Sequence, residues 1–165
     1  MEKENKSPFR QERTIEQEIC GEPIQLVTRP GFPSWRNVTQ AMQLLADNAQ
    51  IRAGQRVLVC PCGNGALGIW AARKGSANRT TLLDTNAIAI EVASHTLAAN
   101  SLAAATVRVG MPTDLGETQD IVLLELPKGR DLARMYFLES FQVLHEGGLL
   151  YMAGANIEGL KSAIL

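Results

Sequence analysis

The feature that most constrains this chain is a short apolar run that breaks at a proline and passes through two glycines into a helical pattern. The run reads Val57-Leu58-Val59-Cys60-Pro61-Cys62-Gly63-Asn64-Gly65. Because glycine lacks a Cβ, the backbone at Gly63 and Gly65 can turn tightly and approach another group closely. The first N–H groups of the following helix have no partner within that helix and favour a polar ligand. The run therefore predicts a ligand-binding turn at the end of a buried strand.

After Gly54, short β-rich runs alternate with helical stretches. Five strands are predicted, at residues 56–60, 80–83, 106–109, 121–124 and 149–152. Helices are predicted from about Asn37 to before Arg52, from Leu67 to a stop at Gly75, over residues 87–99, and from Leu132 to a stop at Gly147-Gly148. Strands joined by helical crossovers favour a parallel sheet covered on both faces, so the predicted fold class is α/β.

The N-terminal region has a different composition. Residues 1–18 are dense in Glu, Lys, Arg and Gln with few large apolar side chains, which predicts a frayed or partner-dependent arm. Residues 22–28 alternate weakly and predict an edge strand, and two prolines within residues 29–33 predict an ordered loop after it. We therefore expect an N-terminal arm and lead-in loop over residues 1–36 and a core over residues 37–165.

Length and charge narrow the class of protein. At 165 residues and 45% hydrophobic, the chain is long enough for one domain and short for two. Lys and Arg total 16 against 17 for Asp and Glu, so RNA would have to meet a local basic patch. Cys20, Cys60 and Cys62 form no disulfide framework, and no apolar run approaches the roughly 18 residues of a membrane helix. We expect a cytoplasmic protein with no membrane partner.

Asp84 is the second residue that indicates a ligand. It follows the predicted strand 80–83, about twenty residues past the glycine turn, where Rossmann topology places a carboxylate that accepts ribose hydroxyls. Hydrogen bonds to a charged acceptor contribute roughly 1.5 to 3 kcal/mol each, so this residue can dominate nucleoside recognition. The alternative is structural, because Asp84 or Asn86 could cap the helix that starts near Ala87.

The glycines alone leave the identity of the ligand open. Gly63, Gly65 and Gly68 also match G-x-G-x-x-G, a pattern that binds the pyrophosphate of dinucleotides. An NAD-dependent oxidoreductase is therefore a second interpretation of the same turn.

Several stretches together resemble class I S-adenosylmethionine-dependent methyltransferases, and within them the small-domain ribosomal-RNA guanine-N2 methyltransferases. These stretches are Thr28–Phe32, Cys62–Gly68, Leu83-Asp84, the helix residues Ala87, Ala93 and Asn100, and Phe137-Leu138, Leu144 and Gly147–Tyr151 near the C-terminal end. A dinucleotide enzyme has no reason to combine the Cys-Gly-Asn-Gly turn with the Gly-Gly-Leu-Leu strand. The resemblance implies a Rossmann-like parallel sheet of five strands, in the order 3-2-1-4-5, lacking the family's last two strands.

The resemblance also implies the site residues. The methyl donor S-adenosyl-L-methionine would be bound by the first strand end and turn, the ribose clamp and the ends of later strands: Cys60, Pro61, Cys62, Gly63, Asn64, Gly65, Asp84, Thr85, Asn86, Met111 and Glu125. An RNA base would be methylated on nitrogen near Glu125, Pro127 and Lys128. No metal is implied, since a Cys-x-Cys pair without a second ligand cluster is typical of core packing.

Three departures from the family pattern affect donor and acceptor. Val59 and Pro61 stand where the family has an acidic residue and a glycine, and Met111 stands where relatives place a polar residue for adenine. We therefore expect Asp84 to carry an unusually large share of the donor affinity. The family's Asn-Pro-Pro-aromatic motif, which orients the acceptor amine, reads Glu125-Leu126-Pro127-Lys128 here. An ionised Glu cannot donate a hydrogen bond, so an inactive methyltransferase-fold binding module is the alternative to an enzyme.

The remaining predictions concern the surface. His95 and His145 have no partner that suggests a catalytic triad and are interpreted as surface or capping residues. Five basic residues would form either a rim for RNA or a solvated face: Arg29, Arg36, Lys128, Arg130 and Arg134. A fifth strand at 149–152 would leave one backbone edge unpaired, so we expect a homodimer or a partner chain over that edge.

Overall fold

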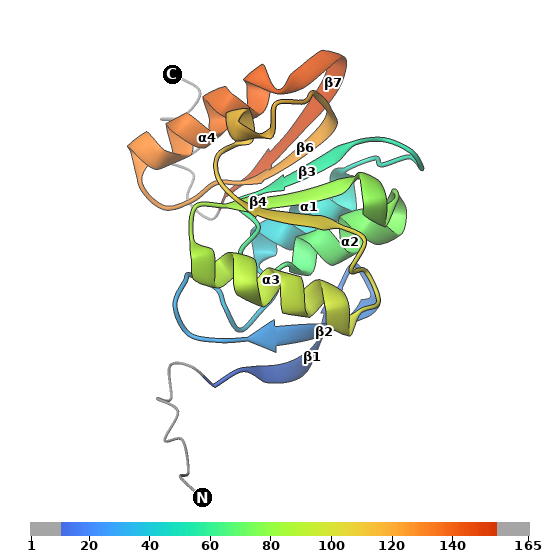
Figure 1. The fold of residues 1–165 in the computed structure, drawn as a ribbon, viewed down its shortest axis with the longest axis vertical. Helices are drawn as coiled ribbons and strands as arrows, with labels where there is room; N and C mark the ends of the chain where they lie inside the picture. Colours follow the sequence, from blue (N-terminus) through green and yellow to red (C-terminus); the bar gives the residue numbers. More distant parts are fainter. Residues whose placement is uncertain (1–10, 155–165) are drawn as a thin grey trace, which may run out of the picture.

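The computed structural model describes residues 11–154, which form two sheets and the helices around them (Figure 1). The strands are β1 (Arg13–Ile19), β2 (Glu22–Thr28), β3 (Val57–Cys60), β4 (Thr80–Asp84), β5 (Thr106–Val109), β6 (Gln119–Glu125) and β7 (Leu144–Ala153). The α-helices are α1 (Gln40–Asn48), α2 (Ala66–Lys74), α3 (Ala87–Ala99) and α4 (Arg130–Gln142). Two short 3-10 helices are η2 (Ala77–Arg79) and η3 (Pro112–Leu115).

The central sheet has five parallel strands in the order β5-β4-β3-β6-β7. This order confirms the predicted Rossmann-like α/β fold with strand order 3-2-1-4-5. Every residue of β3 and β4 is buried, because helices cover both faces of the sheet. Continuous apolar runs such as Val57–Cys60 are the sequence signature of strands in that position.

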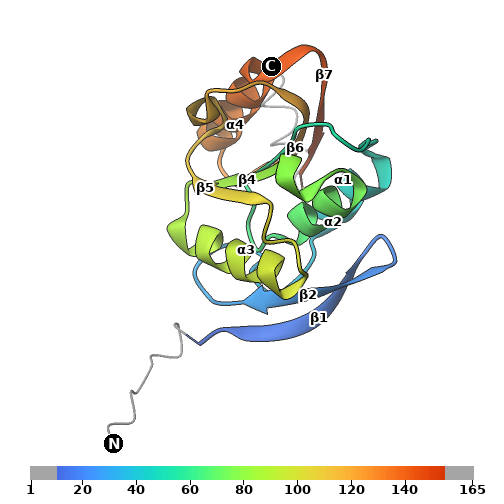
Figure 2. The same cartoon turned by 45° about the vertical axis from the view of Figure 1, so that its right-hand side comes forward.

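Alternate residues of β3 face two different hydrophobic clusters. Val57 and Val59 belong to the larger cluster, which lies beneath α1, α2 and α3. Leu58 and Cys60 belong to a smaller cluster beneath α4 and η3. Figure 2 shows α4 on one side of the central strands and the other three α-helices on the opposite side. The pleat of a single strand thus connects both layers of the core.

An antiparallel hairpin of β1 and β2 replaces part of the expected arm. The prediction of a frayed arm was wrong over Arg13–Ile19, and residues 1–10 lie outside the described part of the chain. The two-residue turn has positive φ at both Cys20 (50°) and Gly21 (75°), as in type I′ turns, whose twist matches that of paired strands. The division of the chain at residues 36 and 37 stays a prediction.

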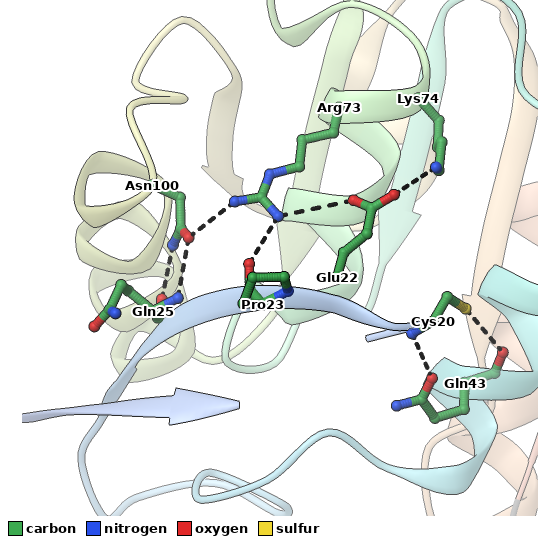
Figure 3. Close-up of polar contacts among 8 residues, drawn as sticks. All are labelled: Cys20, Glu22, Pro23, Gln25, Gln43, Arg73, Lys74 and Asn100. Carbon is green, nitrogen blue, oxygen red and sulfur yellow. Dashed lines mark hydrogen bonds and ion pairs between the residues drawn. The ribbon is translucent and has the colours of Figure 1, made fainter. Parts of the chain in front are cut away.

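The hairpin packs against the core helices through a buried side chain and several hydrogen bonds. Ile19 at the end of β1 is fully buried in the larger cluster. Arg73 of α2 donates to the Pro23 carbonyl at 3.0 Å (Figure 3). Asn100, which follows α3, exchanges two hydrogen bonds with the backbone of Gln25, at 3.0 and 2.7 Å. The hairpin therefore packs on the same core as the helices.

β7 begins earlier than predicted, because α4 ends at Gln142 and strand pairing starts at Leu144. The predicted helix stop at Gly147-Gly148 was wrong. Both glycines lie where the register of β7 against β6 shifts between Gln119 and Ile121, and Gly147 has a φ of 84°. They therefore mark a β-bulge within a strand.

Two further observations concern the outside of the molecule. Over residues 11–154, β7 is an edge strand of the central sheet, with β6 as its one neighbour. None of the described helices combines the length and the apolar character needed to cross a membrane.

Candidate functional site

The turn between β3 and α2 is built around two glycines with positive φ. Gly63 has a φ of 52°, and Gly65, which precedes α2, has a φ of 86°. A Cβ at Gly65 would lie 3.1 Å from the Cα of Ala93 in α3, so a side chain there would press on helix backbone. The Cys62 N–H donates to the Leu83 carbonyl at 2.7 Å. The turn is therefore a close-packed junction of β3, β4 and α3.

Asp84 ends β4 beside this turn and is only 7% exposed. Its carboxylate accepts hydrogen bonds from the N–H groups of Gly63 (3.1 Å) and Asn86 (2.9 Å). Burial raises the pKa of Asp84, and these backbone hydrogen bonds oppose the rise. Since a carboxylate offers about four lone-pair sites, about two remain for a ligand. The N-cap of α3 is Asn86, whose side chain accepts from the Ile88 N–H at 2.9 Å, so the helix-cap alternative does not account for Asp84.

Glu125 ends β6 on the other side of β3. Asp84 and Glu125 end the two strands that flank β3, and each lies two residues beyond a member of the larger cluster, Leu82 and Leu123 respectively. Side chains two residues apart in a strand point to the same face of the sheet. Glu125 accepts a hydrogen bond from the Thr39 hydroxyl at 2.7 Å, and burial raises its pKa. Two carboxylates therefore flank the glycine turn, on the face that α1, α2 and α3 cover.

Thr39 is the site residue that sequence analysis missed. Its hydroxyl oxygen donates to Glu125 and accepts from the Met42 N–H at 3.0 Å, so it caps α1 and also holds the carboxylate. A threonine directly before an apolar helical pattern is an N-cap signal, which could have placed the helix start at Gln40 and not near Asn37.

Replacing Thr39 by alanine should lower the free energy of unfolding by about 1 to 2 kcal/mol at neutral pH. An N-cap side chain contributes about 0.5 to 2 kcal/mol, and Glu125 would lose its hydrogen bond as well. Urea denaturation measures the loss. Thr39→Ser keeps the hydroxyl and should stay within about 0.5 kcal/mol of the wild type. Equal stability of the two variants would contradict the dual role of Thr39.

Glu125→Gln should stabilise the ligand-free protein at neutral pH. Burial raises the pKa of Glu125 above its unfolded value, so the folded state favours the protonated carboxyl. That favourable contribution is complete below the unfolded pKa and is lost as pH rises through the folded pKa. Glutamine can still accept from Thr39 but never ionises. Its stability gain should therefore be largest near pH 7, shrink as pH falls through the raised folded pKa, and vanish below the ordinary glutamate range.

The measurement is the difference in melting temperature between wild type and Glu125→Gln across pH. All other titrating groups are shared by the two proteins and cancel in this difference. A difference that does not vary with pH would contradict the prediction.

Asn64 lies inside the turn and is fully buried. Its side-chain amide donates to the carbonyls of Ser34 and Asn37, both at 3.0 Å, and its oxygen accepts from the Ala66 N–H at 3.1 Å. The side chain therefore ties the lead-in loop to the turn, and Asn64 can offer a ligand only backbone atoms.

Cys60 and Cys62 are also buried, and burial raises the pKa of both thiols, that of Cys60 to about 12. The Cys60 sulfur lies 3.5 Å from the Ser140 hydroxyl, beneath α4. Within residues 11–154, no three His, Cys, Asp or Glu side chains are grouped to hold a metal ion. The two cysteines thus lie among core residues.

The other predicted site residues lie just beyond the strand ends. Thr85 and Asn86 follow β4, Met111 lies just after β5, and Pro127 and Lys128 follow β6. Thr85 and Lys128 are exposed, whereas the other three are half-buried. The fold therefore gathers the predicted residues at the carboxyl edge of the sheet, where open α/β sheets bind ligands.

The five basic residues of the predicted rim differ in their surroundings. Arg29 forms an ion pair with Glu91, and the Arg36 guanidinium lies 4.3 Å from the centre of the Trp35 ring. Three others are exposed in or near the start of α4: Lys128, Arg130 and Arg134.

Both histidines lie at the surface, as the sequence predicted. His95 lies 2.9 Å from a carboxylate oxygen of Glu12, and His145 lies 2.6 Å from one of Asp120. His145 and Asp120 thus join β7 to β6 beside the bulge.

Most of the chain is similar in sequence to known proteins. The sequence profile of the family described as "Methyltransferase small domain" matches residues 23–164. A ribosomal RNA small subunit methyltransferase C from Hamiltonella defensa is 34% identical over 104 residues, which cover 63% of this chain and 31% of that protein. A protein of the same name from Pectobacterium atrosepticum is 28% identical over 90% of this chain and 42% of its own length. This chain therefore spans less than half the length of these relatives.

Solved structures share the fold at lower identity. The T. thermophilus 16S rRNA N2 methyltransferase RsmC, solved with AdoMet and guanosine, has a TM-score of 0.76 at 24% identity, over 86% of this chain and 41% of that one. A precorrin-6y methyltransferase from Geobacter metallireducens has a TM-score of 0.67 at 12% identity, over 84% of this chain and 72% of that one. The names of these two proteins state different substrates, 16S rRNA and precorrin-6y. The shared fold alone therefore does not identify a methyl acceptor.

Proposed function

The chain belongs to the methyltransferase small domain family, and on that premise we propose that it binds S-adenosyl-L-methionine and methylates a nitrogen of an RNA base. Guanine N2 in ribosomal RNA is the first acceptor to test. The main observation behind the proposal is Asp84, whose carboxylate is buried beside the glycine turn and can accept further hydrogen bonds. The relatives whose names include rRNA methylation supply the acceptor class.

The residues around Asp84 suit this donor. Its remaining lone pairs can accept two ribose hydroxyls. A Cβ at Gly63 would make an ordinary van der Waals contact with the Met42 side chain at 3.9 Å. When bound, the donor supplies an electrophilic methyl group on a positively charged sulfur. The proposed donor-binding residues are Cys60, Pro61, Cys62, Gly63, Asn64, Gly65, Asp84, Thr85, Asn86, Met111 and Glu125.

The acceptor end of the proposed site is formed by the loop after β6. The Glu125 carboxylate can accept a hydrogen bond from an exocyclic amine, which would hold the amine in line with the methyl group. Pro127 restricts the loop backbone, and the exposed Lys128 can meet an RNA phosphate. Holding two reactants in line can supply several of the roughly 7 to 11 kcal/mol available from proximity.

A second candidate is a binding module without turnover. It is favoured by Glu125-Leu126-Pro127-Lys128, which provides neither an amide donor nor an aromatic ring for the acceptor base. An NAD-dependent oxidoreductase has only the three-glycine pattern in its favour.

Calorimetry with S-adenosylmethionine, S-adenosylhomocysteine and NAD tests the proposal first. We expect binding of the first two ligands, and binding of NAD alone would overturn the assignment. Transfer of labelled methyl from the donor to total RNA then separates an enzyme from an inactive module.

The proposed function also implies where RNA and a partner chain would bind. RNA would contact the exposed basic residues near the start of α4, in the cytoplasm. A second copy or a partner chain would cover β7, because an edge strand of ten residues offers unpaired backbone groups. Sedimentation of the purified chain at micromolar concentration tests this, and a monomer would count against it.

A further inference from the structure

Within residues 11–154, the two carboxylates beside the glycine turn have only neutral hydrogen-bond partners. Asp84 accepts from two backbone N–H groups, and Glu125 accepts from the Thr39 hydroxyl. Over residues 11–154, none of the ion pairs involves either carboxylate. They end the two strands on either side of β3, so their backbones are about 10 Å apart. The region around the two carboxylates therefore favours a cation.

The proposed reaction changes the charge of the nucleoside in that space. The bond from sulfur to the methyl carbon breaks, and its electron pair stays on sulfur. The acceptor nitrogen forms a new bond to the methyl carbon and loses a proton to solvent. The sulfonium of the donor thus becomes a neutral thioether, whereas the ribose, adenine and amino-acid groups are unchanged.

On the basis of the proposed function, we infer that Glu125 makes the site discriminate the charged donor from its demethylated product. Asp84 is less suited to this role, because its hydrogen bonds from the Gly63 and Asn86 N–H groups disperse its charge. In addition, the ribose hydroxyls that it would bind are the same in the donor and in the product. In the part of the chain that the structure describes, Glu125 has a single hydrogen-bond partner, the Thr39 hydroxyl. It also stands where the family pattern has a neutral Asn. The negative charge would therefore favour exchange of the product for a new donor molecule after each transfer.

Calorimetry on the full chain tests the inference, with S-adenosylmethionine and S-adenosylhomocysteine as probes. The wild type should bind the donor more tightly than the product, and Glu125→Gln should reduce this ratio of dissociation constants by about tenfold. The reduction should come from weaker donor binding, with product binding nearly unchanged. Glutamine has the same shape and can still accept from Thr39, so folding should be preserved.

Two further variants sharpen the result. Glu125→Asp keeps the charge and should keep the preference for the donor. Glu146→Gln removes the same charge from an exposed position in the β7 bulge and should leave the ratio unchanged.

The outcomes distinguish a failure of the role of Glu125 from a failure of the proposed function. An unchanged ratio in Glu125→Gln, with both nucleosides still bound, would overturn the role of Glu125 and leave the proposed function intact. Failure of the wild type to bind either nucleoside would overturn the proposed function and the inference with it.

Discussion

Replacement of Asp84 by alanine should weaken binding of S-adenosylmethionine by about 100-fold or more. Two hydrogen bonds from ribose hydroxyls to a carboxylate contribute roughly 3 to 6 kcal/mol together. Val59, Pro61 and Met111 offer no side-chain hydrogen bond of comparable strength to compensate. Calorimetry measures the change in dissociation constant.

The controls for this experiment address folding and charge. Asp84→Asn keeps one acceptor oxygen and should lose less affinity than Asp84→Ala. Asp47→Ala removes an exposed carboxylate near the far end of α1 and should bind the donor normally. Thermal unfolding of each variant checks that the turn persists without the hydrogen bonds to Gly63 and Asn86. Wild-type affinity in a folded Asp84→Ala protein would place the donor elsewhere.

The second large effect is expected at Gly65. Gly65→Ala should lower the free energy of unfolding by about 2 to 5 kcal/mol, because two penalties add. A side chain at positive φ costs roughly 1 to 2 kcal/mol, and forcing a Cβ to within 3.1 Å of the Ala93 Cα adds about 1 to 3 kcal/mol. Donor binding should fall as well, since the turn would have to move away from α3.

Gly54 provides a matched control within the same chain. It has the same φ of 86° as Gly65, but a Cβ there would meet nothing within 4 Å. Gly54→Ala should therefore show only the conformational penalty, about 1 to 2 kcal/mol. Urea denaturation of both variants isolates the contact between the turn and α3. Equal losses would show that this contact does not stabilise the turn.

The central sheet was predictable because its signals are local. Each buried strand is a short apolar run, and the intervening segments are long enough for helical crossovers, which restricts the topology to few solutions. The places of Gly63 and Gly65 in a turn and of Asp84 at a strand end could be predicted for the same reason, since both features have signatures within a few residues.

Features that depend on distant residues were not predictable. β1 contains few apolar residues, and its stability depends on pairing with β2 and on burial of Ile19 against helices far along the chain. The hydrogen bond between Thr39 and Glu125 joins residues 86 positions apart. The glycines at 147 and 148 carry the same local signal for a helix stop as for a bulge, and tertiary packing decides between them.

The buried side chain of Asn64 has a consequence for local opening of the molecule. Its three hydrogen bonds join the lead-in loop, the turn and the first residue of α2 through one amide that water does not reach. Detaching either loop alone would leave polar atoms of this amide unsatisfied, so the two segments should exchange their backbone hydrogens as one cooperative unit. Passage of an acceptor past the lead-in loop and retention of the donor would then be governed by a single opening equilibrium.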